Sequence, residues 1–181
     1  MPTAIGPRWP TGFRVQCASG SRRWNSCGAN TVDLAPDYNA FFASLIAHRV
    51  EFVVVGAYAL AAHGAPRFTG DIDILIRPTV ENGSRFLEAL RHFGFPPGAL
   101  TAEAVIHPDR LIEMGVQPVQ IHVISTITGV TWDEVWTGRM TGQAGDHEVA
   151  FIGRAEFLRN KRAAGRPKDL ADVEALRTPG E

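Results

Sequence analysis

The sequence is poor in features that mark several classes of protein. Its 181 residues include only two cysteines, Cys17 and Cys27, which lie in one N-terminal stretch without the His and Cys spacing of a zinc site. No apolar run reaches the roughly 18 residues that a membrane-spanning helix needs. The formal net charge of -1 argues against a general attraction to nucleic acid or membranes. We therefore expect a cytoplasmic protein with free thiols, no membrane partner, and phosphate binding only at a local site.

What is present is the composition of one globular domain. Hydrophobic residues make up 45% of the chain and charged residues 20%, and the length suits a single hydrophobic core. Residues 1–33 are rich in Gly, Pro, Ser and Arg and show neither a helical nor a strand period. We predict that they form a poorly ordered N-terminal tail and that one domain covers residues 34–181.

The order of apolar patterns predicts an α/β (α+β) domain with a mixed sheet flanked by helices. Helical spacing begins near Asp37, and the residues expected to form its buried stripe are Tyr38, Phe41, Phe42, Leu45 and Ile46. Further helices are expected over 57–63, 80–93 and 131–136, and in a basic C-terminal segment. Strands are expected over 52–55, 71–76, 110–113, 119–125 and 148–152. The sheet should have at least four strands, some of them antiparallel.

Asp71 and Asp73 are the first candidate site residues. One residue separates them within a strand, so both carboxylates leave the same face of the sheet, while Ile72 points to the other. Two like charges this close favour a bound cation, and Mg²⁺ prefers carboxylate oxygens together with substrate phosphates. The alternative is a solvated sheet edge without function.

Gly56 is the second feature, because it ends the strand at 52–55 and begins a helix. Glycine permits a sharp turn and a close approach of the backbone to a triphosphate, and a helix N-terminus offers free N–H groups. It is otherwise only a turn residue. Arg67 and Thr69 lie in the loop before the acidic strand, where Arg67 is expected either to bind phosphate or to pair with Asp71.

The run VVVGAYALAAHGAPRFTGDIDILI, residues 53–76, resembles the signature of the nucleotidyltransferase family that includes the AbiEii-like and MNT-like proteins of bacterial toxin–antitoxin systems. That signature is a hydrophobic strand, a glycine with a small residue, and Asp-x-Asp. The family often has Gly or Ser at the second position. Here it is Ala57, so a hydroxyl contact to phosphate is missing and only backbone contacts remain.

The segment from Asn160 to Asp172 is similar to a second element of this family, Lys…Arg-x-Lys-Asp-x-x-Asp. Cationic side chains there would bind phosphates, with Arg giving forked contacts and Lys a point charge. These residues are Lys161, Arg162, Arg166 and Lys168. Asp169 is expected to orient Lys161 or to cap the last helix. The plain alternative for the whole segment is a solvated basic helix start.

His122 is the main departure from the family pattern. Active members usually have a third carboxylate on the later strand, where this chain has Val119-Gln120-Ile121-His122-Val123. Imidazole suits Zn, Mn or Fe better than Mg²⁺, and histidine is a competent general base near neutral pH. Three interpretations stay open for His122: a general base, a phosphate donor, or a spacer in a site that has lost catalysis.

The resemblance implies a metal-dependent enzyme that uses Mg²⁺ or Mn²⁺ and transfers a nucleoside monophosphate from an NTP to a hydroxyl. The acceptor would be a tRNA, a protein or a small molecule, and a cognate toxin or antitoxin would be a partner. On this interpretation Asp71, Asp73, His122 and Lys161 are catalytic.

Two alternatives stay open for the function. The first is an inactive module of the same fold that binds a nucleotide or a protein partner. The second is a small-molecule transferase of the aminoglycoside type, which needs an acidic pocket that Glu81, Glu88, Asp109 and Glu113 would supply.

Overall fold

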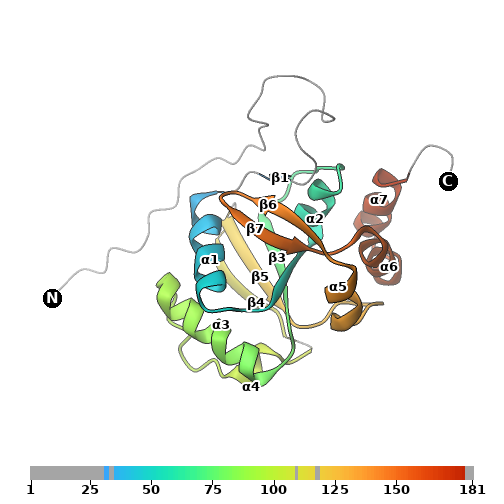
Figure 1. Cartoon of the computed structure of the whole chain (residues 1–181). Helices are drawn as coiled ribbons and strands as arrows, with labels where there is room; N and C mark the ends of the chain where they lie inside the picture. Colours follow the sequence, from blue (N-terminus) through green and yellow to red (C-terminus); the bar gives the residue numbers. More distant parts are fainter. Residues whose placement is uncertain (1–30, 33–34, 109, 117–118, 178–181) are drawn as a thin grey trace.

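The structure is a computed structural model, and it describes residues 31–32, 35–108, 110–116 and 119–177 (Figure 1). The helices are α1 (Pro36–Ala47), α2 (Gly56–Ala62), α3 (Val80–Phe93), α4 (Ala102–Val105), α5 (Trp132–Gly138), α6 (Arg154–Ala164) and α7 (Pro167–Ala175). The strands are β1 (Thr31–Val32), β2 (Phe52–Val55), β3 (Asp71–Ile76), β4 (Ile112–Val116), β5 (Val119–Ile124), β6 (Met140–Ala144) and β7 (His147–Phe151).

The strands form one sheet in the order β1-β6-β7-β2-β3-β5-β4. Its centre is mixed, because β3 is antiparallel to β2 and parallel to β5. Two antiparallel hairpins, β4–β5 and β6–β7, extend the sheet on either side. The expected α/β class, with helices flanking a mixed sheet, is confirmed.

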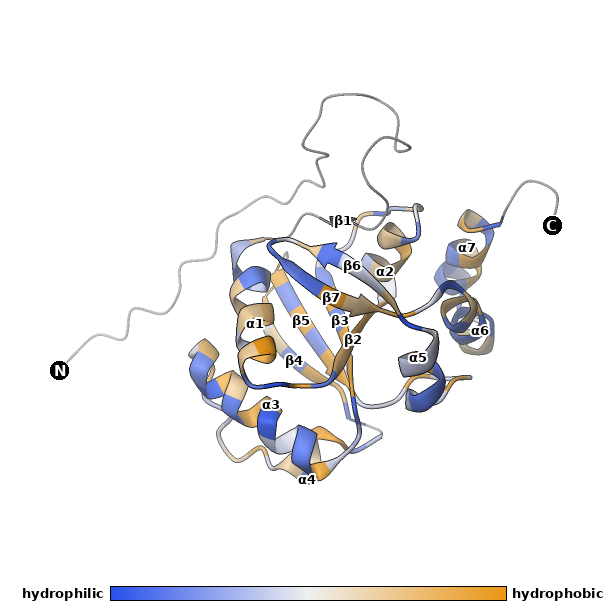
Figure 2. Ribbon diagram, in the orientation of Figure 1, coloured by the Kyte–Doolittle hydropathy of each residue, from blue (hydrophilic) through white to orange (hydrophobic). Residues whose placement is uncertain are grey.

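The central strands form where β-branched residues are concentrated, since such side chains pack well on a pleated surface. All four residues of β2 are buried, while β5 alternates between buried and half-buried positions. Figure 2 shows this alternation as bands of hydrophilic and hydrophobic residues. Strand β3 is half-buried at Asp71 and Asp73 and buried at both faces from Ile74 onward.

Helices α1 and α3 pack together beside the sheet, and α4 lies next to α3 (Figure 1). The Phe41 and Phe93 rings meet edge to face with their centroids 5.4 Å apart. Four residues of the predicted α1 stripe are buried, but Ile46 is 44% exposed, so its inclusion is wrong. At about 100° per residue, Ile46 lies beyond the edge of the arc of the helix that the four buried residues share, so it faces partly outward.

Helices α6 and α7 lie together away from α1, α3 and α4 (Figure 1). Gly165 ends α6 in a left-handed conformation with φ of 64°, and Pro167 begins α7 two residues later. The predicted cap at Thr131 is confirmed, because its side chain accepts from the Glu134 N–H in a capping box. The short joint between α6 and α7 brings these two helices against each other.

Several predicted bounds are displaced in the structure. The strand predicted over 110–113 is β4, which begins at Ile112, and the strand predicted over 148–152 is β7. Helix α4 and strand β6 were missed, since four residues give no readable helical period and Met140–Ala144 includes a glycine. The predicted tail over 1–33, with Cys17 and Cys27, lies outside the described residues except Thr31 and Val32, which pair with β6. No described helix has the length and apolarity to cross a membrane.

Candidate metal and nucleotide site

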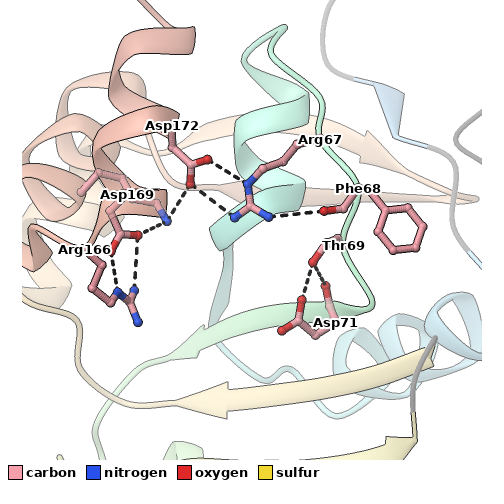
Figure 3. Close-up of polar contacts among 8 residues, drawn as sticks. Arg67, Phe68, Thr69, Asp71, Arg166, Asp169 and Asp172 are labelled. Carbon is pink, nitrogen blue, oxygen red and sulfur yellow. Dashed lines mark hydrogen bonds and ion pairs between the residues drawn. The ribbon is translucent and has the colours of Figure 1, made fainter.

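Asp71 and Asp73 stand at the start of β3 and project from the same face of the sheet. Ile72 between them is buried in the core on the opposite face, so packing of this isoleucine holds both carboxylates in place. The side chains of the two aspartates are 31% and 29% exposed, which leaves their oxygens accessible from a cleft. Thr69 donates its hydroxyl to an Asp71 carboxylate oxygen (Figure 3).

His122 lies directly opposite Asp73 in the parallel pairing of β3 and β5. Its Nδ1 is 3.2 Å from Asp73 Oδ1 and 3.3 Å from Asp71 Oδ2. The hydrogen bond to Asp73 raises the pKa of His122 above its usual value, and this outweighs the opposite effect of burial. The ligand atoms of the three side chains lie within 4.8 Å of one another, which is close enough to hold one metal ion.

Glu113 is a neighbour of the site that the sequence interpretation did not place there. It faces His122 across the β4–β5 hairpin, and its Oε1 is 3.3 Å from His122 Nε2. The signal was present in the hairpin register, because pairing outward from Val116 and Val119 brings position 113 opposite position 122. The predicted strand ended at Glu113, three residues before the observed end at Val116, and this concealed the register.

Gly56 is required at its position for two reasons. Its φ of 64° is in the left-handed region, and a Cβ there would stand 1.9 Å from Asp73 Oδ2. The backbone of the β2–α2 turn therefore lies so close to Asp73 that only a residue without a Cβ fits at this position. Ala57 is buried and does not line the cleft, because its side chain packs into the core behind the turn.

Lys161 and Asp169 are the centre of a buried ion cluster on the α6–α7 side. Lys161 Nζ is 2.8 Å from Asp169 Oδ1 and 3.1 Å from Asp172 Oδ2, and its side chain is only 7% exposed. Removing one partner of such a buried pair typically costs about 3–5 kcal/mol. The expectation that Asp169 orients Lys161 is supported by this contact, whereas its side chain makes no helix cap.

Two arginines complete the cluster, as Figure 3 shows. Arg166 Nε donates to Asp169 Oδ2 at 2.5 Å, and its own side chain is 61% exposed. Burial of the Asp169 carboxyl favours a higher pKa, but hydrogen bonds from Arg166 and Lys161 prevail and lower it to about 2. The expected pairing of Arg67 with Asp71 is wrong: Arg67 forks onto Asp172, at 2.8 Å and 3.3 Å. The packing of α7 brings Asp172 to Arg67. Thr69, and not Arg67, is the side chain that contacts the Asp71 carboxylate.

One cleft of about 590 Å³ joins the acidic and basic groups. The predicted site residues that line it are Gly56, Arg67, Thr69, Asp71, Asp73, His122, Lys161, Arg166 and Lys168. Its remaining walls include Ile124 and Ile127 and polar groups such as Thr126 and Asn160. Carboxylates and cationic side chains therefore face the same space, which is the charge pattern that a cation with an anionic ligand requires.

Arg162 is the predicted phosphate ligand that does not reach this cleft. It lines a second pocket with Arg154, Leu158 and Val173, although the adjacent Lys161 lines the first. Consecutive residues on an α-helix point about 100° apart, so Lys161 and Arg162 face different sides of α6. Adjacent positions in the sequence block therefore do not share one binding surface.

The chain matches no protein-family model, and no curated protein is significantly similar to it. The geometry of the cleft and the chemistry of its side chains are therefore what supports a function for this chain.

Proposed function

We propose that the chain is a metal-dependent nucleotidyltransferase that moves a nucleoside monophosphate from an NTP to a hydroxyl. The observation that carries this proposal is the cleft in which Asp71 and Asp73 face Lys161, Arg166 and Lys168. A triphosphate with its cation carries both signs of charge, so it needs carboxylates for the cation and basic groups for the phosphates.

The two aspartates are the proposed ligands of Mg²⁺ or Mn²⁺. The residues fit such an ion, because the ligand atoms of Asp71, Asp73 and His122 lie within 4.8 Å of one another and open onto the cleft. When bound, a divalent cation neutralises phosphate charge and polarises the reacting phosphoryl group. Gly56 leaves room for the Asp73 carboxylate, since it has no side chain at the point of closest approach.

The basic residues differ in how freely they can bind phosphate. Lys161 is buried between Asp169 and Asp172, so its proposed role is to hold α6 and α7 in position and to contribute positive potential. Arg166 is more than half exposed, and Lys168 is an exposed residue that lines the cleft. These two side chains are the proposed contacts to the β- and γ-phosphates, where pyrophosphate leaves.

In the proposed reaction the acceptor oxygen attacks the α-phosphorus, and the bond from this phosphorus to the β-bridging oxygen breaks. Pyrophosphate takes the electron pair of that bond. The acceptor proton passes to a base, and His122 beside Asp73 is the proposed one, because imidazole accepts a proton near neutral pH. The acceptor class, whether tRNA, protein or small molecule, and a toxin or antitoxin partner follow from the family resemblance alone.

An inactive nucleotide- or partner-binding module is the second candidate. Two observations favour it: His122 stands where a third carboxylate would complete the metal site, and Lys161 is fully engaged by two aspartates. Such a module would bind an NTP in the same cleft without releasing pyrophosphate.

The aminoglycoside-type alternative has less support, since the acidic residues it requires are not gathered. Glu81 and Glu88 pair with Arg85 and Arg91 along α3 and do not line the cleft. Asp109 lies outside the described residues, and only Glu113 lies near the site.

NTP-dependent labelling tests the proposed function. The chain is incubated with Mg²⁺ or Mn²⁺, each α-labelled NTP in turn, and cell extract, in parallel with Asp71→Asn. Label transferred by the wild type and not by Asp71→Asn supports a nucleotidyltransferase and identifies donor and acceptor together. NTP binding that depends on the metal, without transfer, would instead establish the inactive module.

A further inference from the structure

Three carboxylates surround one imidazole in a row that crosses three neighbouring strands. Asp73 on β3 pairs with His122 on β5, and His122 pairs with Glu113 on β4. The His122 Nδ1 atom faces the aspartates, at 3.2 Å from Asp73 and 3.3 Å from Asp71, and Nε2 lies 3.3 Å from Glu113 Oε1. The two ring nitrogens therefore face two different partners.

The Nε2 atom is buried, and it is the single buried side-chain nitrogen or oxygen without a hydrogen bond among the described residues. Glu113 Oε1 is near enough but out of line, and the Glu113 side chain is 56% exposed. A rotation of this exposed carboxylate would align the bond, which would satisfy a buried polar group that is otherwise costly.

The position of the proton on the neutral His122 ring decides which ring nitrogen is a hydrogen-bond donor and which carries a free lone pair. Without a cation, the Nδ1–H of His122 donates to Asp73, because an ionised carboxylate only accepts. When a cation replaces this proton, a neutral imidazole that donates Nε2–H to Glu113 presents its Nδ1 lone pair to the space between Asp71 and Asp73. Metal-binding histidines commonly donate their second nitrogen to a carboxylate in this way, which fixes the ring and makes it a better ligand.

We propose that Glu113 is a positioning residue that orients His122 as a third metal ligand, and that the resulting site prefers a first-row transition-metal ion to Mg²⁺. Mg²⁺ demands oxygen ligands, whereas an imidazole nitrogen beside two carboxylates strengthens binding of transition-metal ions. This inference rests on the proposed function and deepens it, since it names the metal class of the same site. A His122 that binds the metal through Nδ1 and donates Nε2–H to Glu113 has no lone pair left, so on this inference the acceptor proton passes to solvent water instead of to His122.

Metal affinity of the full chain tests the inference without any turnover. Mg²⁺, Mn²⁺ and Co²⁺ are titrated separately and followed by calorimetry and by the shift in melting temperature. We expect Mn²⁺ and Co²⁺ to bind at least about 10-fold more tightly than Mg²⁺. Glu113→Ala should weaken Co²⁺ binding about 10- to 100-fold, the usual effect of losing such a support, and leave Mg²⁺ binding nearly unchanged.

Three variants separate this role from a merely structural one. Glu113→Gln keeps an oxygen acceptor and should restore most of the Co²⁺ affinity that Glu113→Ala loses. His122→Asp should reverse the order and favour Mg²⁺. Glu103→Ala, at an exposed glutamate on α4, is the matched control and should bind like the wild type. Paramagnetic shifts of the His122 ring protons with Co²⁺ report ligation directly.

Equal or tighter binding of Mg²⁺ by the wild type, or Co²⁺ affinity unaltered in a folded Glu113→Ala, would overturn the inference. Absence of any metal binding would overturn both the inference and the metal-dependent function. The expected metal preference without label transfer would leave the inference standing and remove only the transferase function.

Discussion

Replacing Gly56 by alanine adds a Cβ atom at the point where the β2–α2 turn lies closest to Asp73. The new Cβ would stand 1.9 Å from Asp73 Oδ2, where ordinary contact begins at 3.4 Å, so the carboxylate would have to move by about 1.5 Å. In enzymes, moving a reacting group by about 1 Å lowers the reaction rate on the order of 100-fold. We therefore expect Gly56→Ala to lower label transfer by at least about 100-fold.

The same substitution should also lower the stability of the fold. A left-handed conformation costs a residue with a Cβ about 1–2 kcal/mol, and the φ of Gly56 is 64°. For a domain of this size about 1 kcal/mol corresponds to about 2–4 °C, so the melting temperature should fall by about 2–8 °C. The clash with Asp73 adds to this cost if the carboxylate cannot move aside.

Gly64→Ala is the matched control, because Gly64 has φ of 95° but no atom within 4 Å of its added Cβ. Both variants should have a lower melting temperature than the wild type. Only Gly56→Ala should also lose Mn²⁺ binding and label transfer. The measurements are thermal unfolding with and without Mn²⁺ and the labelling assay. Wild-type metal binding by Gly56→Ala, or an equal loss in Gly64→Ala, would refute the argument from close approach.

Two further predictions concern the basic side of the cleft. Because the pKa of Asp169 is lowered from 3.8 to about 2, its ion pairs contribute fully above pH 3.8 and are lost as the pH falls toward 2. Urea unfolding between pH 5 and pH 3 should therefore show a steeper loss in wild type than in Asp169→Asn, and parallel curves would contradict the assigned pairs. Arg166→Ala should weaken NTP binding by about 10- to 150-fold, since a hydrogen bond to a charged group is worth about 1.5–3 kcal/mol. Arg162→Ala should bind like the wild type because Arg162 lines a different pocket, and an equal loss in the two arginine variants would contradict the proposed phosphate contacts.

Sequence patterns predicted the secondary structure best where the signal was local and strong. The β-branched residues of β2 and the long period of α3 placed those elements correctly. Short elements such as α4 were missed, because a single turn is too short to display a period. The edge hairpin was misplaced at β4, which shows that strand ends depend on pairing with a neighbour more than on composition.

The sequence alone was sufficient to place Asp71 and Asp73 side by side, because a strand sends alternate residues to one face whatever surrounds it. It also pointed to Gly56, since a glycine between a strand and a helix marks a turn whose backbone conformation is strained for residues with a Cβ. Only the tertiary structure decided which groups meet these residues. Strand register brought Glu113 to His122, and the packing of α7 turned Arg67 toward Asp172. Such pairings arise between residues far apart in the chain, whose meeting depends on the packing of the whole domain rather than on any local pattern.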